Sequence, residues 1–209
     1  MTEACESNHV LLMEAFMYRY SDRVRQLKTL LDSGMTGEIR HISASFRFLL
    51  DWDNDVRMAP ELGGGSLYDV GCYPVNFIGM ITGRLPSAVQ AQVVMQNGVD
   101  YSFSALLEYE NGLICNVNSG FDACEQMEVQ IAGTLGNLST PDLFWGNAGS
   151  MAVKTKAGRQ EIAVAESSPY RLEVEDFADA ILNGRKPLLS LEETLLNMKV
   201  IDRLMALIR

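Results

Sequence analysis

The spacing of apolar residues changes along this chain, and the first change separates a helix from a strand. Residues 21–34 carry Val24, Leu27 and Leu31 at helical spacing, which predicts an amphipathic helix. Residues 42–48 then alternate between apolar and polar side chains, as a half-buried strand does. The first part of the chain is therefore expected to form a helix followed by a strand.

Residues 63–83 begin with three glycines and continue as a mainly apolar run. Ser66 is a candidate helix cap, and Gly83 is a natural stop. Pro74 lies inside the predicted helix, where its missing N–H removes a backbone hydrogen bond. We therefore expect a helix from about Ser66 to Gly83 whose start is reset, or whose axis is kinked, by Pro74.

From Ser87 to about Ala165 the apolar positions alternate almost throughout. They fall into successive short runs, separated by turn-forming residues at 97–98, 110–112 and 156–158. Connections this short join antiparallel neighbours and cannot contain a crossover helix. The pattern predicts a sheet that is mainly an antiparallel meander.

The C-terminal region returns to helical spacing and predicts two helices. The apolar residues of the first are spaced for one face: Leu172, Val174, Phe177, Ala178 and Ile181. Gly184 is available to end it. The second is predicted from Ser190, which forms the capping pattern S-x-x-E with Glu193.

Composition and charge exclude several classes of partner. With 47% hydrophobic residues the chain can bury a core, and intrinsic disorder is ruled out. The 27 acidic and 17 basic residues give a net charge of −10, the wrong sign for binding nucleic acid or an anionic membrane. The sequence shows neither a membrane-spanning apolar run nor an export signal, so a cytoplasmic location is expected.

The potential metal ligands are widely scattered. Four cysteines, at positions 5, 72, 115 and 124, match neither a zinc pattern nor a dense disulfide framework. Two histidines, His9 and His41, are too few for a histidine-built site. Reduced thiols and no metal are expected.

Candidate chemistry centres on Asp69 and Tyr73, which are four residues apart and so share one helix face. A carboxylate beside a phenol is suited to acid–base work, although the same spacing also serves a plain surface contact. Gly63 to Gly65 lack the pattern of a dinucleotide-binding loop. They indicate either a flexible helix start or a close backbone approach to a ligand.

Two further groups have both an ordinary and a functional interpretation. Arg57 lies among acidic residues in a polar loop around residues 51–57, where a solvated turn is the simpler interpretation. Tyr18, Arg19 and Tyr20 stand just before the first predicted helix. They belong either to the edge of the core or to a surface that faces substrate.

Taken together, five stretches of the chain resemble the C-terminal part of the Gfo/Idh/MocA oxidoreductases. The stretches, whose order and spacing make the resemblance specific, are Leu12–Tyr20, Ser33–Ile39, Glu61–Asn76, Ala132–Leu138 and Tyr170–Met198. The resemblance implies an α+β fold with a large, mostly antiparallel, open-faced sheet covered on one face by helices. It covers nearly all of residues 1–209, which are expected to be one substrate-binding and oligomerisation domain.

The resemblance also implies a site. Asp69 and Tyr73 match the family's D-x-G-x-Y signature and are expected to be catalytic, while Tyr18, Arg19 and Arg57 match positions that bind substrate. Tyr73 points to the branch of glucose-fructose oxidoreductase, dihydrodiol dehydrogenase and xylose dehydrogenase. The family's usual His-Pro reads Ser21-Asp22 here.

In that family NAD or NADP is held by an N-terminal nucleotide-binding domain, which is not expected in these 209 residues. This chain alone is therefore expected to bind no cofactor and to be inactive in isolation. Two hypotheses remain: part of an NAD(P)-dependent oxidoreductase acting on a sugar, diol or polyol, or a non-catalytic module for oligomerisation or ligand binding. Val94, Leu106 and Ile114, apolar residues on the second parity of their strands, indicate at least a homodimer formed through the sheet.

Overall fold

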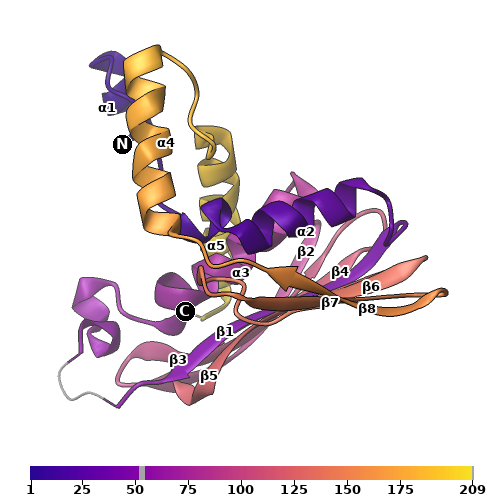
Figure 1. The fold of residues 1–209 in the computed structure, drawn as a ribbon. Coiled ribbons are helices and arrows are strands. Elements are labelled where there is room, and N and C mark those ends of the chain that lie inside the picture. Colours follow the sequence, from indigo (N-terminus) through magenta and orange to yellow (C-terminus); the bar gives the residue numbers. More distant parts are fainter. Residues whose placement is uncertain (52–54, 209) are drawn as a thin grey trace.

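The computed structural model describes residues 1–51 and 55–208. In this part of the chain, eight strands form one sheet that has helices on one face, with further helical segments standing away from it (Figure 1). The fold is α+β with a mostly antiparallel sheet, as predicted. Two positions in the predicted polar loop, Asp53 and Asn54, lie outside the described residues.

The helical elements are α1 (Thr2–Ser7), η1 (Met17–Tyr20), α2 (Asp22–Asp32), η2 (Val56–Met58), η3 (Pro60–Leu62), η4 (Leu67–Gly71), α3 (Cys72–Thr82), α4 (Pro169–Asn183) and α5 (Leu191–Ile208). The strands are β1 (Ile39–Leu49), β2 (Ala88–Gln96), β3 (Val99–Glu108), β4 (Ile114–Gly120), β5 (Asp122–Gly133), β6 (Gly136–Thr140), β7 (Gly149–Thr155) and β8 (Gly158–Val164). The cap predicted at Ser190 with Glu193 is confirmed, and Ser21 caps α2 in the same way, because both serine side chains accept from a backbone N–H of the following turn.

The strand order is β2-β3-β4-β1-β5-β6-β7-β8: β2–β4 and β5–β8 follow the predicted antiparallel meander, and β1 interrupts it. β1 lies between β4 and β5, parallel to β4 and antiparallel to β5. Only Phe121 separates β4 from β5, and one residue is too short for a hairpin loop. Phe121 instead crosses the end of β1, where its carbonyl accepts from the N–H of Leu50 at 3.0 Å.

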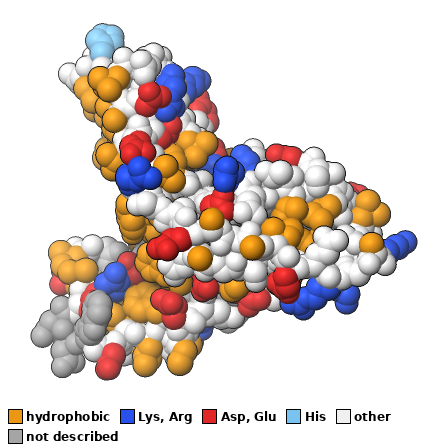
Figure 2. Space-filling view, in the orientation of Figure 1, with side chains coloured by type: hydrophobic (Ala, Val, Ile, Leu, Met, Phe, Trp, Pro, Cys, Tyr) orange, Lys and Arg blue, Asp and Glu red, His pale blue; other side chains and the backbone are white. Residues whose placement is uncertain are grey.

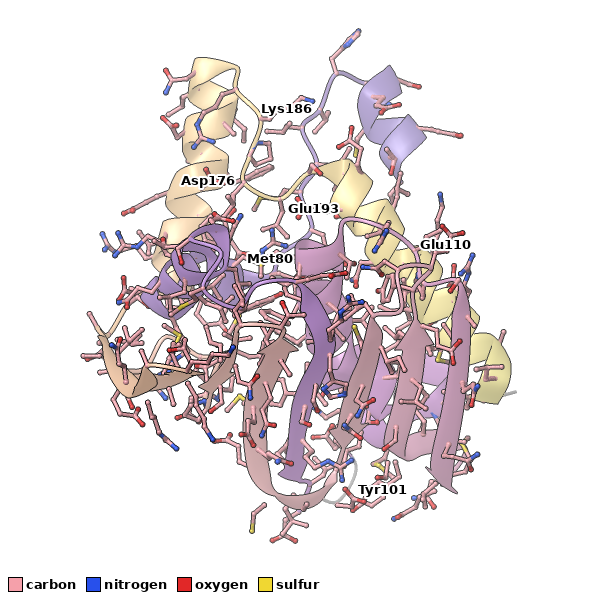
Figure 3. All side chains as sticks on the ribbon, turned by 90° about the vertical axis from the view of Figure 1, so that its right-hand side faces the viewer. Met80, Tyr101, Glu110, Asp176, Lys186 and Glu193 are labelled. Carbon is pink, nitrogen blue, oxygen red and sulfur yellow. The ribbon has the colours of Figure 1, made fainter. Side chains whose placement is uncertain are left out.

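The face of the sheet beneath the helices forms the core. Along β1, Ile42, Ala44 and Phe46 are buried against neighbours on β4 and β5. α2 contacts β8, α3 contacts β1 and β4, and α5 contacts β2. Figure 3, turned by 90° from the view of Figure 1, shows the strands in front of α3 and α5. This arrangement leaves one face of the sheet open.

α4 forms an arm that projects from the body (Figure 1), and α1 lies at the same end of the molecule but apart from α4 (Figure 3). The arm is attached near its base by Tyr20, whose hydroxyl donates to Asp176 Oδ2 at 2.8 Å; Figure 3 labels Asp176 on α4. Two residues of the predicted apolar face of α4, Val174 and Ile181, are exposed (68% and 57%). The predicted helix is confirmed, but its apolar residues are partly exposed because α4 has little of the body beside it. Figure 2 shows apolar side chains on the surface of this arm.

Candidate active site

The three-glycine loop brings the backbone against a buried carboxylate. Gly65 has φ +120°, a conformation that side chains disfavour. A Cβ at this position would lie 2.0 Å from Asp100 Oδ1. The close approach that the glycine permits is therefore to Asp100 of this same chain.

The predicted helix after the glycines begins with one wide turn. Leu67–Gly71 is π-helical, and regular α-helix begins only at Cys72. Pro74 is the third residue of α3, where N–H groups have no partner within an α-helix. The predicted reset of the helix at Pro74 is confirmed, and π-turns of this kind are frequent at functional sites.

Arg57 and Asp69 form an ion pair at the start of this helix. The Nε of Arg57 donates to Asp69 Oδ2 at 2.7 Å, and Asp55 contacts the same guanidinium at 3.3 Å. Burial alone would lower the pKa of Arg57, but its hydrogen bonds and charge interactions with the two carboxylates raise it above the usual value. Arg57 is therefore a fixed cation rather than a free residue of a solvated turn.

Tyr73 stands in a cluster of aromatic rings. Its ring centroid lies 5.5–5.9 Å from those of Phe16, Tyr18, Phe46 and Phe144. Burial raises the pKa of Tyr73 to about 12, and nearby acidic groups add to the shift. The phenol is therefore protonated at neutral pH, and the rings around it limit how far it can turn.

Asp69 and Tyr73 interact electrostatically. The carboxylate of Asp69 hydrogen-bonds to Arg57, while its charge helps to raise the pKa of Tyr73. Glu173 on α4 raises the same pKa, and burial in turn raises the pKa of Glu173. The structure thus brings Asp69, Tyr73 and Arg57 into one region, in which Tyr73 has acidic groups on more than one side.

The other two predicted substrate-binding residues lie beneath this region. Tyr18 has no exposed surface, and its hydroxyl donates to Asn76 Oδ1 at 2.7 Å. Arg19 is 8% exposed and pairs with Glu193 at 2.9 Å. Figure 3 labels Glu193, at the start of α5. Tyr18 packs against the Tyr73 ring, while Arg19 is held by Glu193 and Asn76. Direct contact with substrate stays a prediction for both residues.

A cavity of about 400 Å³ opens beside the aromatic cluster, and its residues were missed from the sequence. Its walls include Trp145, which contacts Phe46, and Tyr170, whose charge interaction with Tyr73 raises the pKa of that phenol. The carbonyl of Gly146 accepts from the N–H of Ser167 at 2.8 Å and closes one side. The two aromatic residues are 25 positions apart in the sequence and have no shared motif.

Arg23 fixes the loop that carries Trp145. This arginine is 1% exposed and donates to the carbonyls of Asn147 and Ser150 and to the Thr140 hydroxyl at 3.0–3.2 Å. Burial lowers its pKa. The sequence pattern of the first helix places Arg23 on a polar position, so no signal marked it as a core residue.

Among residues 1–51 and 55–208, no group of three His, Cys, Asp or Glu side chains is placed to hold a metal ion. The helices described there include none with the length and apolarity needed to cross a membrane.

Comparison with curated proteins finds oxidoreductases of sugars and diols. The chain is 35% identical to D-xylose 1-dehydrogenase (NADP(+)) 2 of Haloferax volcanii over 95% of its own length and 62% of that protein. It is 28% identical to trans-1,2-dihydrobenzene-1,2-diol dehydrogenase of Xenopus laevis, over 95% of this chain and 63% of that one. The chain therefore spans about three fifths of the length of these relatives.

Solved structures share the fold at lower identity. KijD10, a 3-ketoreductase from Actinomadura kijaniata in complex with NADP and TDP-benzene, superposes with a TM-score of 0.89 at 23% identity and covers 98% of this chain and 65% of its own. Aldose-aldose oxidoreductase from Caulobacter crescentus, complexed with glycerol, gives a TM-score of 0.91 at 20% identity, covering 99% of this chain and 64% of its own. The model of the GFO/IDH/MocA C-terminal domain matches residues 24–139. This protein belongs to the GFO/IDH/MocA family of oxidoreductases.

Proposed function

We propose that this chain is the substrate-binding part of an NAD(P)-dependent oxidoreductase that acts on a sugar, diol or polyol. Tyr73 transfers the proton, and Asp69, held by Arg57, orients the substrate hydroxyl. The observation that carries the proposal is the position of Tyr73, a phenol with a pKa of about 12 that is fixed by aromatic rings beside the Arg57–Asp69 pair. The names of the curated relatives favour this class of substrate.

The direction of the pKa shift indicates how Tyr73 works. A phenol that stays protonated at neutral pH can donate its proton to a carbonyl oxygen while hydride reaches the carbonyl carbon. In the oxidation direction the same oxygen must accept a proton, which requires a cation to favour the phenolate. The acidic groups Asp69 and Glu173 near Tyr73 are suited to hold such a cation in place.

A nicotinamide cofactor, when bound, supplies or accepts the hydride at the substrate carbon. We place its binding in a nucleotide-binding domain outside residues 1–209, because the relatives are longer than this chain. On this proposal the described residues bind and orient the substrate and move its proton. The isolated chain then shows no turnover of aldoses or polyols.

The cavity beside Trp145 suits the ring of a sugar or diol. Aromatic rings bind the apolar C–H face of such a ligand, while hydroxyl groups bind its polar edge. Trp145 and Tyr170 supply the rings, and Ser167 and Ser168 line the same cavity. We therefore propose that the substrate binds between Trp145 and Tyr73.

The test joins this chain to the nucleotide-binding domain of the xylose dehydrogenase relative and measures turnover with NADP and a panel of sugars and diols. Tyr73→Phe keeps the ring packing and removes only the hydroxyl. A proton-transfer role should cost about 10²- to 10⁴-fold in kcat. Tyr68→Phe is the matched control, since Tyr68 lies on the π-turn that precedes α3 and is 38% exposed. Turnover of Tyr73→Phe within about threefold of the parent would contradict the role.

The open face of the sheet supports a second function, assembly. Val94, Leu106 and Ile114 are 41–61% exposed on this face, next to polar residues of the neighbouring strands. A sheet face of this kind is stable when a partner covers it. Light scattering of the isolated chain at micromolar concentration should give at least a dimeric mass. A monomeric mass would contradict assembly through the sheet and would leave the proposed catalytic role unaffected.

A further inference from the structure

Asp100 is a buried carboxylate that the proposed chemistry does not use. It lies at the start of β3 and is 2% exposed. Its Oδ2 accepts from the backbone N–H of Leu67 at 2.7 Å and from the Ser66 hydroxyl at 3.1 Å. Asp100 therefore caps the π-turn from outside the helix, in place of a side chain from the helix itself.

The neighbouring strand extends this contact. The hydroxyl of Ser66 lies 2.9 Å from the hydroxyl of Ser119, which belongs to β4. All three side chains are buried. Two strands of the sheet thus hold the beginning of the helix that carries Asp69.

The same carboxylate also fixes the loop that carries Arg57. Gly65 lies against Asp100 with no room for a Cβ. The N–H of Gly65 donates to the carbonyl of Arg57 at 2.9 Å, and the carbonyl of Gly65 accepts from the N–H of Asp69 at 3.2 Å. Both members of the Arg57–Asp69 pair are therefore attached through their backbones to the residue that rests on Asp100.

We propose that Asp100 is a positioning residue, whose carboxylate sets the geometry of the Arg57–Asp69 ion pair. Its relevance to catalysis rests on the proposed function above. The claim that Asp100 sets the geometry of the ion pair depends only on the contacts of Gly65 and Leu67. Removing the carboxylate leaves the N–H of Leu67 and the hydroxyl of Ser66 without their acceptor, and the loop and the helix then lose their common anchor.

The test measures Arg57 directly, in the isolated chain. Its side-chain Nε–H, assigned by comparison with Arg57→Lys, should exchange slowly with solvent because it is bonded to Asp69. Asp100→Ala should speed this exchange by about tenfold or more, the factor expected when about 1.4 kcal/mol of local stability is lost. Asp100→Asn, which keeps the shape and one acceptor oxygen, should restore most of the protection. Asp179→Ala, on the exposed surface of α4, is the control and should change nothing.

Unchanged exchange in a folded Asp100→Ala variant would overturn the proposal. If that variant does not fold, Ser66→Ala replaces it, since it removes only one of the two hydrogen bonds to Asp100. Faster exchange in Ser66→Ala supports the positioning role, and unchanged exchange overturns it. Because this measurement needs neither cofactor nor substrate, its failure would leave the role of Tyr73 standing, and the reverse also holds.

Discussion

A tyrosine lies at each end of α3, but the charged neighbours and the backbone contacts of the two ends differ. Each end has a tyrosine whose pKa burial raises to about 12, Tyr73 at the start and Tyr109 beside the end. The charges around Tyr73 raise its pKa further, whereas Thr82 and Arg84 lower that of Tyr109. A raised phenol pKa therefore reports burial, and only the neighbouring groups separate a candidate for chemistry from a packing residue.

The backbone differs between the two ends as well. Gly83 ends α3 at φ +63° with open space around its Cα, while Gly65 at the start is pressed against Asp100. The end of the helix is an ordinary left-handed cap. The start is held by contacts with Asp100, with Ser119 and with the loop that carries Arg57.

The largest expected effect comes from adding one methyl group at each end. Gly65→Ala should cost about 3 kcal/mol or more in the free energy of unfolding, because strain and overlap with Asp100 act together. Gly83→Ala should cost only about 1 kcal/mol, since the strain there is confined to the backbone. Urea unfolding followed by circular dichroism measures both. Equal losses would show that the two ends are held alike.

A second effect depends on pH. Both tyrosines favour the protonated phenol in the folded chain, while an unfolded tyrosine titrates near ~10. Their contribution to stability is therefore complete below pH ~10 and is lost as the pH rises toward ~12. Tyr73→Phe and Tyr109→Phe should each make this loss smaller, by on the order of 1 kcal/mol near pH ~12, allowing for the partial exposure of Tyr73. Urea midpoints across this pH range test it, and variants as alkali-sensitive as the parent would contradict it.

A third comparison separates the two arginines. Arg57→Lys keeps the charge but loses the Nε donor to Asp69, so kcat/KM of the fused enzyme should fall by about tenfold. Arg84→Lys changes only a cation placed 5.8 Å from the Tyr109 ring, and should cost about 0.5 kcal/mol of stability or less. Turnover and thermal unfolding of both variants complete the comparison. A similar loss of activity in both would place Arg57 outside the site.

The start of α3 also shows which structural features the sequence patterns can predict. Pro74 correctly predicted that the helix would be reset, because proline acts on its own backbone. The cap predicted at Ser66 was wrong, since the Ser66 hydroxyl makes no capping hydrogen bond and donates to Asp100 instead. Alternation correctly predicted the strands of the sheet. It could not place β1 between β4 and β5, because that order depends on the single residue Phe121 and on pairing between distant segments.

The residues of the candidate site divide in the same way: those within one motif were predicted, and those brought together only by the fold were not. Asp69 and Tyr73 are visible because one motif contains both. Arg57 is visible through the resemblance to the family, although its pairing with Asp69 is not. Asp100 and Trp145 lie 31 and 72 residues beyond Asp69 and Tyr73, and only the folded sheet brings them near.

The way Arg23 anchors the Trp145 loop also affects which side chains that loop can carry. Arg23 holds that loop mainly through the carbonyls of Asn147 and Ser150, and every amino acid has a carbonyl. The identity of the side chains on the loop is therefore independent of what anchors it. On the proposed function, we expect substitutions of Trp145 to change substrate preference while the loop keeps its path.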